Sequence, residues 1–105
     1  MLDLSVLKDK TYDIKLENGE VLHINKPTQK MMKTVIEMSE VMQTGIADLE
    51  KVDKLFDFVT TIFNYNRDDK KFEKEQIEDM FDITVAMYIV QDYLKFTSNV
   101  LADPN

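Results

Sequence analysis

The sequence of 105 residues contains no cysteine and only two glycines and two prolines. The absence of cysteine excludes disulfides, thiolate nucleophiles and cysteine-based zinc sites, and it is compatible with a reducing cytosol. The scarcity of glycine and proline predicts long regular elements with few irregular loops. A chain of this length fits one domain, residues 1–105, with a modest hydrophobic core.

Positive charge is scarce as well. Thirteen lysine and arginine residues stand against twenty aspartates and glutamates, which gives a formal net charge of −7, and Arg67 is the single arginine. A nucleic-acid partner requires clustered lysines and arginines that release counterions from phosphates, so we expect none. The simplest interpretation is that the acidity keeps a helical surface soluble.

Signals for export or membrane insertion are also missing. The first ten residues lack a basic stretch followed by an apolar run, so they are not expected to be a signal peptide. The most apolar stretch, residues 83–101, contains Asp92 and Lys95, which argues against a membrane span. We therefore expect a cytoplasmic protein with no membrane partner.

Residues 10–24 alternate apolar and polar side chains around Asn18-Gly19, which predicts a β-hairpin. A two-residue loop would mix the two faces of the hairpin. A three-residue loop, residues 17–19 with Gly19 left-handed, keeps the apolar residues together by pairing Ile14 with Leu22 and Tyr12 with Ile24. An isolated hairpin is marginal in water, so its apolar face must rest on helices or join strands of another chain.

Helical periodicity predicts four further elements, at about residues 27–43, 49–65, 73–81 and 83–101. Asn25 or Thr28 can cap the first helix, Gly45 supplies its stop, and Asp48 caps the second. Asp82 is a good N-cap, which favours a break before the last helix. The apolar positions of the second helix are Leu49, Val52, Leu55, Phe56, Val59, Ile62 and Phe63.

The helix at residues 83–101 carries apolar side chains over about 200° of its circumference. A single neighbour covers about half that width, so we expect this helix to be held from two directions or more. The expected fold is mainly α with a short N-terminal β-hairpin (α+β), with three to four helices packed around this C-terminal helix. Residues 2–10 form either a short strand or a turn, and residues 102–105 are expected to fray.

No arrangement of residues predicts catalysis or a cofactor. His23 is the only histidine, and a nucleophilic or metal site needs several groups brought together, so a solvent-facing or rim position is expected. Residues 64–75 have the spacing of a calcium loop, with Asn64, Asn66, Asp68 and Glu75 at the ligand positions. Asp69, however, replaces the required glycine, and lysines follow it. The acidic residues of the third helix share one face and are interpreted as a solvated surface: Glu75, Glu78, Asp79 and Asp82.

Methionine is concentrated on the helix at residues 27–43, which holds four of the six methionines that follow Met1. Methionine fills irregular cores, and it also lines surfaces that grip varied apolar partners. Core filling is the simpler interpretation of these methionines. Two helices and the hairpin carry more apolar width than a short chain readily buries, and this excess supports the alternative of an interaction surface. We therefore hypothesise a partner-facing stripe beside a second pair, Met32 and Ile36. The stripe consists of Met31, Val35, Met38 and Met42.

Taken in order, the chain has an N-terminal hairpin segment, LKDKTYDIKLENGEVLHINKPT, and a helix that opens at its KPT. An F-x-x-E-x-I-x-D-M-F segment (Phe72 to Phe81) and an apolar last helix follow. This arrangement resembles the small tail assembly chaperones of long-tailed bacteriophages, especially those that infect low-GC Gram-positive bacteria. The motifs are patterns of residue type, and no active-site residue is carried over.

The resemblance implies a non-enzymatic protein of the host cell cytoplasm that needs no cofactor. It would bind the long helical tape-measure protein, keep it soluble and deliver it to the tail-tube protein. It would also self-associate and be absent from the mature virion. An alternative from another class is a small acidic regulator that occupies a basic surface of a host or phage protein, whose binding would collapse as salt rises.

Overall fold

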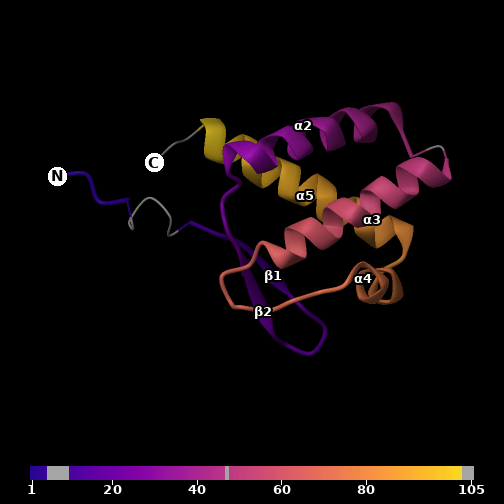
Figure 1. Cartoon of the computed structure of the whole chain (residues 1–105), viewed down its shortest axis with the longest axis horizontal. Coiled ribbons are helices and arrows are strands. Elements are labelled where there is room, and N and C mark those ends of the chain that lie inside the picture. Colours follow the sequence, from indigo (N-terminus) through magenta and orange to yellow (C-terminus); the bar gives the residue numbers. More distant parts are fainter. Residues whose placement is uncertain (5–9, 47, 103–105) are drawn as a thin grey trace.

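The computed structural model describes residues 1–4, 10–46 and 48–102, with side chains as far as residue 98. The expectations for residues 2–10 and 102–105 lie partly outside these residues. The elements are β1 (Tyr12–Lys15), β2 (Val21–Ile24), α2 (Gln29–Thr44), α3 (Leu49–Asn64), α4 (Lys74–Met80) and α5 (Ile83–Ala102). The predicted fold class, mainly helical with an N-terminal hairpin, is confirmed. Figure 1 shows the long helices α2, α3 and α5 together, with the hairpin and α4 below them.

The hairpin forms in the predicted register. Its antiparallel pairs include Tyr12 with Ile24 and Ile14 with Leu22. The Leu16 N–H donates to the Glu20 carbonyl over 2.8 Å, which leaves a three-residue loop, and Gly19 adopts a φ of +92° there. The odd loop length keeps the apolar side chains on one face because side chains alternate with period two.

Capping residues named in the sequence fix the ends of α2 and the start of α3, although α2 begins at Gln29, two residues later than predicted. Of the two candidate caps for α2, Thr28 is the one used, and its Oγ1 accepts the Met31 N–H over 3.3 Å. Gly45 ends α2 with a φ of +95°, a region that favours glycine. Asp48 caps α3 by accepting the Lys51 N–H over 2.9 Å.

The predicted break before the last helix is also confirmed. Phe81 is extended, with a φ of −131°, so the helical hydrogen-bond ladder stops after α4. Asp82 Oδ1 then accepts the Val85 N–H over 2.8 Å, which caps the first turn of α5. The break lets α4 turn away and bury Ile77 in the core.

Helix α3 occupies the middle of the molecule, since it contacts α2, α4, α5 and β2. As expected from its apolar width, α5 is held from two sides, by α3 and by α2, so the two helices share the central position. Phe58 is only 2% exposed although it lies outside the predicted apolar positions of its helix. The reason is that α3 is covered on more than one side, and the Phe58 ring meets Tyr93 of α5 at 6.2 Å between centroids.

Tyr12 ties the hairpin to α5. Its hydroxyl donates to Asp92 Oδ2 over 2.7 Å, and its ring packs against Tyr93 and Phe96 at 5.4 and 5.5 Å between centroids. Burial, together with the neighbouring Asp92 carboxylate, raises the pKa of Tyr12 above its ordinary value. The phenol therefore stays protonated as a donor across the physiological range.

Tyr93→Phe is expected to stabilise the protein by about 1 kcal/mol, a few degrees in Tm. The Tyr93 hydroxyl is buried and has no hydrogen-bond partner among the described residues, and its burial raises its pKa. Phenylalanine removes the cost of burying that group and keeps the ring contacts with Tyr12 and Phe58. Thermal denaturation followed by circular dichroism measures the change, and a lower Tm for the variant would contradict it.

Candidate functional site

The stripe predicted to face a partner lies mostly in the core. Met31, Val35 and Met38 are 8%, 4% and 3% exposed, and Met42 is half-buried against the same core. This corrects the hypothesis that the four side chains form an open surface. The physical reason is that α2 packs against both α3 and α5, and these two neighbours cover the face that carries the four side chains, whereas Ile36 of the second pair stays 56% exposed.

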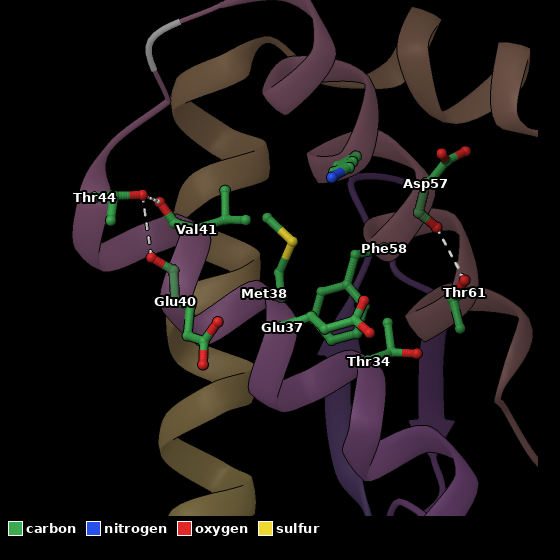
Figure 2. A pocket seen from close by; sticks show the side chains of 10 residues that line it. Thr34, Glu37, Met38, Glu40, Val41, Thr44, Asp57, Phe58 and Thr61 are labelled. Atoms are coloured by element: carbon green, nitrogen blue, oxygen red, sulfur yellow. Dashed lines mark hydrogen bonds between the residues drawn. The ribbon is translucent and has the colours of Figure 1, made fainter.

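Beside this buried stripe, α2 and α3 leave an open groove of about 530 Å³ (Figure 2). Most of its lining follows the three–four spacing of one helix face, which is the geometry that a third helix can complete. From α2 the groove is lined by Thr34, Glu37, Met38, Glu40, Val41 and Thr44, and from α3 by Lys54, Asp57, Phe58 and Thr61. One residue of the predicted stripe, Met38, therefore does reach the groove.

The floor of the groove is apolar. Met38 and Phe58 form its buried base, and the half-buried Val41 stands beside them. Figure 2 shows that the Thr44 and Thr61 hydroxyls bond within their own helices, to carbonyls 3.2 Å and 3.0 Å away. These donors are already used, so a partner in the groove need not satisfy them.

The two walls of the groove differ in charge. On the α3 side, Asp57 accepts a hydrogen bond from Lys74 of α4 over 2.9 Å, and Asp53 accepts another. The hydrogen bonds to Asp53 and Asp57 raise the pKa of Lys74, and this pairing offsets the charge of Asp57 on a wall that Lys54 also lines. On the α2 side, Glu37 and Glu40 are exposed and line the groove. The groove thus has an apolar floor and one acidic wall.

His23 lies at the outer edge of β2 and contacts the loop that follows α3. Its Nδ1 is 3.0 Å from Asp68 Oδ1, and its backbone N–H donates to Asp68 Oδ2 over 2.7 Å. The rim position was predictable, but Asp68 lies 45 residues away and no local pattern indicates this partner. The pair holds the hairpin to the loop, and among the described residues it belongs to no group of three or more possible metal ligands.

Asp68→Asn is expected to remove a pH-dependent part of the stability. The His23 N–H donates to the Asp68 carboxylate and holds the pKa of that carboxyl below its ordinary value of 3.8. A lowered folded pKa contributes stability above the unfolded pKa, and this is lost as pH falls through the folded value. The Tm difference between native protein and variant should therefore be largest near neutral pH and shrink below about pH 4. Thermal denaturation across the pH range measures it, and a pH-independent difference would contradict the assignment.

The loop with calcium-like spacing is organised by its own asparagines. The Asn64 side-chain amide donates to the Phe72 carbonyl over 2.8 Å, and its oxygen accepts the Phe72 N–H over 2.7 Å. Asn66 Oδ1 accepts the N–H groups of Asp68 and Lys70 over 3.0 and 3.1 Å. Two of the side chains counted as calcium ligands are therefore engaged in holding the loop itself.

Within residues 1–4, 10–46 and 48–98, no group of three or more histidine, aspartate or glutamate side chains could hold a metal ion. The acidic residues Glu75, Glu78, Asp79 and Asp82 are all exposed.

Among the described helices, none has both the length and the apolar content needed to cross a bilayer.

Comparisons with protein-family models, curated proteins and solved structures give no match for this chain. Function therefore has to be inferred from the surfaces of the molecule itself. The feature with the clearest binding geometry is the groove between α2 and α3 (the α2–α3 groove).

Proposed function

We propose that the protein is a non-enzymatic tail assembly chaperone of a long-tailed bacteriophage, which binds the tape-measure protein and keeps it soluble in the host cytoplasm. The observation that supports this most is the α2–α3 groove, with its apolar floor and its acidic wall. A long apolar helix can lay one side into such a groove. The resemblance to tail assembly chaperones supplies the identity of the client and its later delivery to the tail-tube protein.

The dimensions of the groove suit a helical client. The α2 wall runs from Thr34 to Thr44, which is about 15 Å of helix at 1.5 Å per residue, or nearly three turns. A docked helix would place apolar side chains at three–four spacing over Met38, Val41 and Phe58. Lysines or arginines flanking that apolar stripe would meet Glu37 and Glu40.

Co-expression of the native protein with a tape-measure fragment tests the function directly. We expect the soluble fraction of the fragment to rise when the protein is present. An unchanged soluble fraction would show that the proposed function is wrong.

The acidic regulator remains a second candidate because Glu37 and Glu40 give one wall of the groove a negative charge and the chain carries a net charge of −7. A pull-down of the client at low and at high ionic strength separates the two. Contacts dominated by apolar burial persist in salt, whereas contacts dominated by charge are screened. Loss of binding at high salt would favour the regulator over the chaperone.

A further inference from the structure

The two edges of the hairpin differ in their hydrogen-bond partners. The loop after α3 covers the outer edge of β2: the Arg67 N–H donates to the His23 carbonyl over 2.9 Å, and the Asn25 N–H donates to the Tyr65 carbonyl over 3.0 Å. Among the described residues, β1 pairs with no strand other than β2. An edge without a strand partner is a template for another strand.

The ladder shows which backbone groups of β1 are open. In an antiparallel pair, residues alternately direct both backbone groups toward the neighbouring strand and both away from it. The Leu16 N–H donates to the Glu20 carbonyl, so Leu16 and every second residue before it face β2. Asp13 and Lys15 therefore direct their N–H and C=O groups outward. The same alternation in β2 directs His23 outward, where the loop binds it.

We propose that this edge pairs with the same edge of a second copy of the chain, antiparallel, with the two-fold axis at Ile14. In that register Asp13 lies opposite Lys15 of the second copy, and Lys15 lies opposite its Asp13. Opposite charges in directly opposed positions stabilise a strand pair. The edge is therefore complementary to itself.

Other registers of the strand pair are less stable. A shift of two residues places Asp13 opposite Asp13 or Lys15 opposite Lys15, and like charges in opposed positions destabilise the pair. A shift of one residue brings inward-facing backbone groups against outward-facing ones and moves the apolar side chains to the wrong face. Charge thus selects one register.

The surface beside this edge is mostly apolar, although Lys15, Glu17, Asn18 and Asp79 also line it, and this is an independent observation. A hollow of about 670 Å³ is lined by residues 14–18 of the hairpin and by α4 and α5, and no residue of β2 lines it. It therefore lies on the β1 side of the hairpin. Met80 and Val85 line it and are 42% and 41% exposed. A strand added to β1 would extend the sheet toward these side chains, which favours a second copy, because its Ile14 lies beside Ile14 on the same face.

Sedimentation of the full chain over a concentration series tests the pairing. The native protein should dimerise, and Lys15→Asp or Asp13→Lys alone should raise the dimer dissociation constant at least about tenfold, because like charges then face each other. The double exchange Asp13→Lys with Lys15→Asp should restore dimerisation. All three variants change exposed side chains, and circular dichroism verifies that they fold. A monomeric native protein, single variants that dimerise normally, or a double exchange without rescue would each overturn the proposal.

A disulfide provides a second readout that does not depend on charge. The chain contains no cysteine, so Ile14→Cys introduces one thiol per subunit at the proposed axis. Opposed residues of this type are about 4.5 Å apart at Cα, which a disulfide can span. Oxidation should yield a covalent dimer of Ile14→Cys but not of the control Val21→Cys, whose residue lies on β2. Equal cross-linking of the two variants would contradict the register.

Discussion

Phe63→Ala is expected to lower the free energy of unfolding by about 3–5 kcal/mol, because it opens a cavity in the middle of the core. The Phe63 side chain is fully buried, and its ring meets Phe72 and Phe81 edge-on at 5.3 and 5.5 Å between centroids. These contacts join the end of α3 to the loop and to the α4–α5 junction. The total free energy of unfolding of a small domain is about 5–15 kcal/mol, so this loss is a large part of it. Tm should fall by roughly 15–30 °C.

Urea denaturation followed by circular dichroism measures this loss. Leu49→Ala is the matched control, since Leu49 lies on the same helix but is 86% exposed, and its truncation should change stability by about 0.5 kcal/mol or less. If Phe63→Ala were no more destabilising than Leu49→Ala, the position of α3 at the centre of the fold would be contradicted.

Filling the α2–α3 groove with charge is expected to abolish solubilisation of the client. Thr34→Arg and Thr61→Arg place long cationic side chains on opposite walls of the groove, where they exclude an apolar helix from the floor. Each should weaken client binding at least about tenfold, because its charge would be buried beneath the docked helix. Thr34 and Thr61 are exposed, so these variants should fold, whereas a charge at Met38 or Phe58 would disrupt the core.

Ile36→Arg is the control for these groove variants. Ile36 lies on α2 and is 56% exposed, but it does not line the groove. The soluble fraction of the co-expressed tape-measure fragment should fall with the two groove variants and stay unchanged with Ile36→Arg. If both groove variants kept the fragment soluble, the client would bind elsewhere on the protein.

Local chemistry was sufficient to predict the hairpin and the helix boundaries. The register around Gly19 follows from one requirement, that Tyr12 and Ile14 share a face with their partners. The caps at Asp48 and Asp82 follow from the preference of short polar side chains for orphan N–H groups. Such features depend on residues within a few positions of one another, so they are visible in the sequence.

The features that position the candidate site depend on distant parts of the chain. Periodicity gives the apolar width of α2, but it does not show that α3 and α5 together cover Met31 and Val35. The burial of Phe58 and the pairing of His23 with Asp68 have the same origin, since each depends on an element far away in sequence. The groove itself exists only where α2 and α3 meet, so no stretch of residues predicts it.

Amide chemical-shift mapping by NMR tests the central claim most directly. The labelled full-length protein is titrated with a helical peptide from the tape-measure protein. We predict that the largest shift changes fall along the α2–α3 groove, at Thr34, Glu37, Val41, Asp57 and Thr61, with little change in the hairpin. Shift changes concentrated on the hairpin and the α4–α5 junction, or none at saturating peptide, would contradict the claim that this groove binds the client.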